Sequence, residues 1–84
     1  MPEKTLVGKI AHYYTNIGVA VIELTHELKQ GDTISIEGAS TNFEQSVESM
    51  QVEHKNVPEA KAGDSIGIKV AERVRPGDKV YKVA

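Results

Sequence analysis

The chain has 84 residues, 39% of them hydrophobic and 26% charged, which is the composition of one ordinary globular domain covering residues 1–84. Ten basic residues against twelve acidic ones give a net charge of −2, which does not indicate a strongly basic nucleic-acid binder. The absence of cysteine excludes thiolate chemistry, and no apolar run approaches the about 20 residues that a membrane helix needs, so we expect a cytoplasmic protein.

The first half of the chain reads as short strands. Leu6, Gly8 and Ile10 are expected to line the inner face of a first strand. Residues 19–22 are apolar on both faces, which predicts a central strand. Residues 33–37 alternate strictly between polar and apolar, the pattern of a strand with one face on a core.

The stretch between the second and third of these strands gives poor support for a helix. Residues 22–30 include good helix formers, but also β-branched Thr25, and Gly31 follows at once. An extended connection or a single turn is therefore expected.

A longer, less regular strand is predicted over residues 43–52. Its apolar positions change parity between Val47 and Met50, as they do when one extra residue is inserted into a strand. We therefore expect a β-bulge near Glu48 or Ser49.

Three glycine–aspartate pairs each open an apolar segment. They are Gly31-Asp32, Gly63-Asp64 and Gly77-Asp78. Glycine supplies a positive φ at a turn, and aspartate bonds to nearby backbone amides. The last two pairs precede strands over residues 65–70, with Ile66, Ile68 and Val70 inward, and 79–83. The pattern predicts an all-β fold, a six-stranded antiparallel, Greek-key-like barrel.

Several of these segments, in order and spacing, resemble domain II of the elongation factor Tu family. They are residues 18–21 (GVAV), 29–38 (KQGDTISIEG), 47–50 (VESM), 60–68 (AKAGDSIGI) and 75–80 (RPGDKV). The beginning of the chain, from Gly8-Lys9-Ile10 to Gly18-Val19-Ala20, is also similar to the small C-terminal barrel of collagenase-like peptidases linked to tRNA modification. The resemblance implies a translation-factor-type β-barrel.

The resemblance also implies a binding site. In the elongation factors this barrel holds the aminoacylated 3′ end of tRNA, and the matching positions are Glu48, Gln51 and Ser65. Glu48 keeps the family's acid, whereas Gln51 replaces an arginine and Ser65 an asparagine, so a phosphate-binding cation is missing. Nucleotide hydrolysis is not expected, because Gly8-Lys9 is followed by Ile10 and not by the Ser or Thr of a P-loop.

Two further features are candidates for RNA contact. Tyr13 and Tyr14 could stack on unpaired bases, although neighbouring strand residues point to opposite faces, so the alternative is that one of them caps the barrel. Residues 69–82 carry a local excess of positive charge that includes Arg73, Arg75 and Lys82. The alternative for these bases is a set of solvated side chains on edge strands.

No catalytic or metal-binding pattern stands out. His12, His26 and His54 lack the short spacing of metal ligands, and no serine lies in a nucleophile elbow. We therefore expect no enzyme, no cofactor and no metal. The leading interpretation is a binding module connected to translation or tRNA metabolism, with tRNA, the ribosome or a translation-related protein as partner. The alternative is a protein–protein or regulatory barrel for a separate GTPase or peptidase.

Overall fold

The computed structural model describes residues 4–39, 41–53 and 55–83, which form strands and turns. The strands are β1 (Lys4–Tyr14), β2 (Val19–Leu24), β3 (Leu28–Lys29), β4 (Thr33–Glu37), β5 (Asn42–Ser46), β6 (Met50–Val52), β7 (Lys55–Val57), β8 (Glu59–Ala60), β9 (Ser65–Lys69) and β10 (Lys79–Val83). Across these ranges there is no helix with the length and apolar character needed to cross a membrane.

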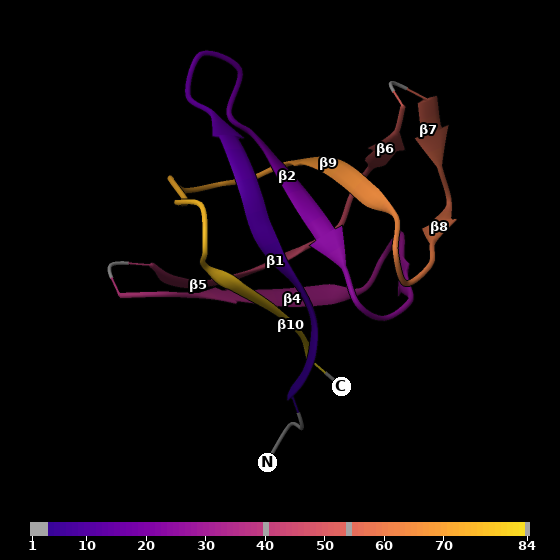
Figure 1. Cartoon of the computed structure of the whole chain (residues 1–84), viewed down its shortest axis with the longest axis horizontal. Coiled ribbons are helices and arrows are strands. Elements are labelled where there is room, and N and C mark those ends of the chain that lie inside the picture. Colours follow the sequence, from indigo (N-terminus) through magenta and orange to yellow (C-terminus); the bar gives the residue numbers. More distant parts are fainter. Residues whose placement is uncertain (1–3, 40, 54, 84) are drawn as a thin grey trace.

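Eight of the strands form one antiparallel sheet that curls round on itself (Figure 1). Their order is β5-β4-β10-β1-β2-β9-β6-β7, and β3 pairs with β8 separately. The chain runs from β5 at one end of the sheet directly into β6 near the other end, so the two ends are brought together. The β1–β2 hairpin stands out at the top of Figure 1, and the start of β1 lies at the opposite end of the view, near the end of β10. The predicted all-β, antiparallel barrel class is confirmed.

The expected strand count of six is too low, since ten strands occur in the described residues. The predicted long strand over residues 43–52 is wrong in detail, because β5 and β6 are separate and the expected bulge near Glu48 or Ser49 is instead a link between them. Val47 still pairs with the turn that precedes β4. Its N–H donates to the Asp32 carbonyl and its carbonyl accepts from Gly31 N–H, both at 2.8 Å.

The bulges lie in β1. Its pairing with β10 shifts between Leu6 and Gly8, and its pairing with β2 shifts between Ile10 and His12. The first shift turns Val7 into the core and leaves Leu6 42% exposed, so the predicted inward position of Leu6 is wrong. Gly8 and Ile10 are buried as expected.

The core is aliphatic and comes from nearly every strand. Its buried members are Val7, Ile10, Ala20, Ile22, Leu24, Leu28, Ile34, Ile36, Val47, Met50, Ala60, Ile66, Ile68, Val70, Val74 and Val80. The inward faces predicted for residues 33–37 and 65–70 are confirmed, and β2 is central, between β1 and β9. Residues 22–30 are extended as expected and end in β3.

The three glycine–aspartate turns share one hydrogen-bond pattern. Gly31, Gly63 and Gly77 have φ of 94°, 92° and 95°. In each turn the aspartate carboxylate accepts from the backbone N–H three residues earlier, at 2.9 to 3.0 Å, and the aspartate N–H donates back to the carbonyl of that same residue. The aspartates therefore bond a preceding amide and not a following one, and each turn is closed from both sides before its strand begins.

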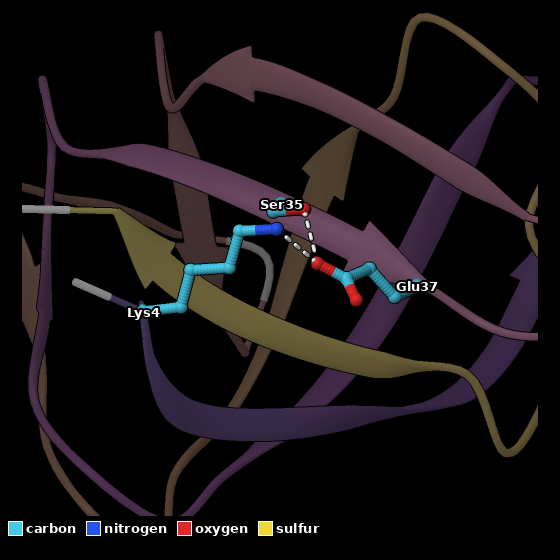
Figure 2. A network of polar contacts seen from close by, with 3 residues as sticks. All are labelled: Lys4, Ser35 and Glu37. Carbon is cyan, nitrogen blue, oxygen red and sulfur yellow. Dashed lines mark hydrogen bonds and ion pairs between the residues drawn. The ribbon is translucent and has the colours of Figure 1, made fainter. Parts of the chain in front are cut away.

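A polar network covers the outer side of β4 (Figure 2). Ser35 is fully buried, and its hydroxyl donates to Glu37 Oε2 at 2.9 Å. Lys4 Nζ donates to the same oxygen at 2.6 Å. The hydrogen bond from Lys4, followed by that from Ser35, lowers the pKa of the Glu37 carboxyl, and the bond to Glu37 raises the pKa of Lys4.

Candidate binding groove

A groove of about 570 Å³ lies on the outside of the barrel, over β2, β9 and β6. We call it the outer groove, and it is lined by Tyr14, Ile17, Val19, Val21, Gln51, Glu53, Ser65, Ile66 and Gly67. The sheet register explains its position, because Val21 pairs with Gly67 and Gly67 pairs with Gln51. These residues point away from the core formed by their neighbours Ile22 and Ile68.

Gly67 creates the hollow. It sits in the middle of β9 and places no side chain between Val21 and Gln51. A Cβ at this position would meet Val19 Cγ1 at 3.5 Å, an ordinary contact, with no closer neighbour. A glycine inside a strand often marks a place where a ligand or another backbone comes close.

The walls of the groove are apolar and aromatic. Tyr14 is 48% exposed and Ile17 is 62% exposed, both unusually open for large apolar side chains. Val19 and Val21 are half-buried beneath them. Such a surface suits an uncharged planar group that stacks on the tyrosine.

Polar groups are confined to the far side of the groove. Ser65 offers a hydroxyl, and Gln51 Nε2 donates to Asn56 Oδ1 at 3.2 Å, so the side-chain oxygen of Gln51 can still accept a hydrogen bond. The described residues that line the groove include the acid Glu53 but no cation. Phosphate groups would therefore have to be bound outside it.

The structure brings together three of the seven predicted binding residues. Tyr14, Gln51 and Ser65 share the outer groove, although they were predicted for two unrelated reasons. Glu48 is apart from them. It lies in the link between β5 and β6, lines a second hollow, and its carbonyl accepts from Gln30 Nε2 at 2.6 Å.

Tyr13 and Tyr14 have different environments, as alternation predicts. The register shift between Ile10 and His12 pairs Tyr13 with buried Ala20, so Tyr13 packs against the core. Tyr14 pairs with Val19 on the outer face, where its ring meets that of His12 edge-on at 4.5 Å. Of the two, Tyr14 is the one placed for stacking.

The predicted basic residues do not form one strand end. Arg73 and Arg75 are exposed in the loop between β9 and β10, which we call the arginine loop (residues 71–77). Lys82 lies further along β10, where its Nζ is 3.5 Å from Asp32 Oδ2. β10 runs between β4 and β1, so the expectation that these charges belong to edge strands is wrong. In Figure 1 the loop (orange to yellow, left) lies on the other side of the hairpin from β6 and β7.

The histidines are spread out. His12 lies in β1 near the tip of the hairpin, and His26 follows the far end of β2, where its N–H contacts the Val7 carbonyl. His54 lies outside the described residues. No group of three His, Cys, Asp or Glu that could hold a metal occurs in the part of the chain that the structure describes.

Sequence reasoning missed the apolar wall and floor of the outer groove. Val19 and Val21 were interpreted only as part of a strand buried on both faces, and Gly67 only as one position of an alternating segment. The glycine was the available signal, because glycine inside an otherwise regular strand is unfavourable unless its lack of a side chain is used.

Comparison with known proteins places the fold. No protein-family model matches the chain. The C-terminal domain of a Geobacillus thermoleovorans protein assigned to the U32 peptidases superposes with a TM-score of 0.87 at 21% identity, over 93% of this chain and 91% of that one. A bacterial selenocysteine-specific elongation factor gives a TM-score of 0.70 at 25% identity, over 96% of this chain and 14% of that one. The chain is a translation-factor-type β-barrel.

Sequence relatives of the barrel are longer proteins. An uncharacterized protease of Methanocaldococcus jannaschii is 47% identical over 79 residues, which is 93% of this chain and 19% of that protein. A collagenase of Porphyromonas gingivalis is 43% identical over 82 residues, 95% of this chain and 23% of that protein. The barrel therefore spans about a fifth of the length of these relatives. The predicted resemblance to translation factors and to collagenase-like proteins is confirmed.

Proposed function

We propose that this barrel is a non-enzymatic binding module for an unpaired segment of RNA, connected to translation or tRNA metabolism. The observation that carries the proposal is the outer groove, which Tyr14, Gln51 and Ser65 line together. An exposed ring beside neutral hydrogen-bonding groups is a suitable receptor for a splayed-out base. The similarity to a selenocysteine-specific elongation factor supports the link to translation.

The charge distribution supports the same proposal. Because the groove lining offers an acid and no cation among the described residues, a base is a better occupant than a phosphate. The arginine loop offers two exposed guanidinium groups outside the groove for the RNA backbone. With a net charge of −2, the chain has little long-range attraction for RNA, so we expect weak, salt-sensitive binding.

The test is a titration of labelled single-stranded RNA and labelled tRNA at two salt concentrations. The Gly67→Leu variant fills the floor of the groove without a backbone conflict and should abolish most of the affinity. Thr5→Leu adds the same side chain to an exposed position of β1, remote from the groove, and should bind like the unmodified chain. Absence of any affinity at low salt would contradict the proposal.

A second candidate is a protein-binding or regulatory barrel for a peptidase. It is favoured by the relatives named protease and collagenase, in which the matching segment is about a fifth of the protein. Co-purification of a specific peptidase, with no RNA retained, would favour this role. The non-enzymatic part of the proposal is tested separately, because hydrolysis of a fluorogenic peptide or of gelatin by the purified chain would overturn it.

A further inference from the structure

The segment that leaves β9 is held from two sides. Gln45, in β5, donates from Nε2 to the Lys69 carbonyl at 2.9 Å, and its Oε1 accepts from Ala71 N–H at 2.7 Å. On the opposite side, Val70 N–H donates to the carbonyl of Gly18, the last residue of the turn between β1 and β2, at 3.0 Å. Three consecutive residues are thus fixed between β5 and the β1–β2 hairpin.

Gln45 makes the bonds that a strand would make here. β5 pairs by its backbone only with β4, within the described residues. The side-chain amide of Gln45 donates to the carbonyl of one residue and accepts from the N–H two residues later, as the N–H and C=O of one residue in a parallel neighbouring strand do. The Gln45 side chain therefore joins β5 to the segment after β9, where no backbone pairing links them in the described residues. We call this junction the seam of the barrel.

The same segment leads directly into the arginine loop. Ala71 begins the loop, Val74 in its middle is buried, and Arg75 N–H donates to the Asp78 carboxylate at 3.0 Å. Arg73 and Arg75 stand on either side of the buried Val74 and are exposed. The loop is fixed at its start, middle and end, with both arginines on the side turned away from the core.

We propose that Gln45 is a positioning residue that holds Arg73 and Arg75 ready to contact RNA phosphates. The inference rests on the proposed function. Without the Gln45 amide, the start of the loop gains freedom that RNA binding must remove again, although Val74 and Asp78 still hold the rest. If the start of the arginine loop is free in the unbound protein, ordering it when RNA binds weakens the affinity by about three- to tenfold.

Gln30 provides a matched control. Its Nε2 also donates to the backbone of a distant segment, the Glu48 carbonyl at 2.6 Å, but it does not touch the arginine loop. Gln45→Ala removes both bonds of the seam, and Gln45→Glu keeps the length of the side chain while losing the donor to Lys69. The second variant serves if the first does not fold.

The experiment measures the affinity of each variant for a fluorescein-labelled single-stranded RNA at two salt concentrations, together with hydrogen exchange at the Ala71 amide. We expect faster exchange at Ala71 in Gln45→Ala, which loses the acceptor of that amide. Binding should be about three- to tenfold weaker for both Gln45 variants, with wild-type affinity for Gln30→Ala. Wild-type affinity in the Gln45 variants, or an equal loss in Gln30→Ala, would overturn the positioning role alone. Absence of binding by the unmodified chain would overturn the proposed function, and this inference with it.

Discussion

Lys4 Nζ lies 2.6 Å from Glu37 Oε2, so the start of β1 is tied to the end of β4 across β10, which separates the two strands. The oxygen that accepts from Lys4 also accepts from the buried hydroxyl of Ser35, and Figure 2 shows the Lys4 side chain reaching over the sheet to this point. The pair is partly exposed, so it contributes to register more than to stability.

The pair predicts a pH dependence of stability. The lowered pKa of Glu37 gives a contribution that is present above the usual carboxyl pKa of about 4.3 and is lost as pH falls through the lower folded value. The raised pKa of Lys4 gives a second contribution to stability. It is present below the usual lysine pKa of about 10.4 and is lost as pH rises through the higher folded pKa. The melting temperature of Glu37→Gln should therefore differ from wild type at neutral pH and converge with it in acid. Glu59→Gln removes an exposed acid of β8 outside this network and serves as the control variant.

Two glycines four residues apart should differ in how much a substitution destabilises the barrel. Gly63 has a φ of 92° and open space on the side where a side chain would project, so Gly63→Val suffers from backbone strain alone and should lose about 1–3 kcal/mol of unfolding free energy. Gly67 has ordinary strand geometry, so Gly67→Ala should change stability by less than about 1 kcal/mol. Urea denaturation measures both, and equal effects would contradict the assignment of the turn.

The three aspartate turns should differ in strength although they share one pattern. Asp78 is buried, and its carboxylate lies against Gly38, whereas Asp64 is half-exposed. Removing the carboxylate in Asp78→Ala leaves the Arg75 N–H without its acceptor in a partly buried place, with an expected loss of about 1–3 kcal/mol. Asp64→Ala should lose about 0.5–1.5 kcal/mol, because water can replace the acceptor. A larger loss at Asp64 in thermal denaturation would show that burial does not set the order.

The inward face of β4 gives a sharp test of the core. Ile36 is fully buried, so Ile36→Asp places an unpaired charge among aliphatic side chains and should unfold the domain. Ile17→Asp makes the same chemical change at a side chain that is 62% exposed and should leave the melting temperature almost unchanged. Circular dichroism distinguishes the two, and a folded Ile36→Asp would mean that the face is assigned incorrectly.

The elements that sequence predicted well are those whose pattern is local. The alternation of residues 33–37 and 65–70 and the three glycine–aspartate turns each depend on neighbours within a few positions. The errors arise where distant residues decide. Val47, where β5 ends, bonds with Gly31 and Asp32 before β4, and Val7 rather than Leu6 enters the core because of a register shift against β10.

The candidate site shows the same division. Tyr14, Gln51 and Ser65 were named from the sequence, by an aromatic cluster and by a family resemblance, but nothing in the sequence placed Tyr14 beside the other two. Their meeting depends on the register that pairs Gly67 with both Val21 and Gln51. The role of Gln45 is likewise invisible in sequence, because its partners lie 24 and 26 residues away.

The last prediction separates the two physical terms of RNA binding. Arg73 and Arg75 are expected to bind phosphates, so replacing both with alanine should weaken binding of every RNA sequence and lower the salt slope by about 0.7 for each phosphate that is no longer neutralised. Tyr14→Ala should weaken binding by about 1–3 kcal/mol while leaving the salt slope unchanged, because stacking releases no counterions. Leu6→Ala removes another exposed apolar side chain of β1, away from the outer groove, and should have no effect.

Fluorescence anisotropy at two or more salt concentrations gives both the affinity and the slope for each variant. Tyr13 should not behave like Tyr14, since it packs against the core and its replacement should lower the melting temperature. If the tyrosine variant changed the slope, or the double-arginine variant changed only the affinity for particular sequences, the assignment of base and phosphate to separate surfaces would be wrong. If neither variant changed a measurable affinity, the RNA would bind elsewhere on the barrel, and the outer groove would be better explained as a contact surface for a peptidase.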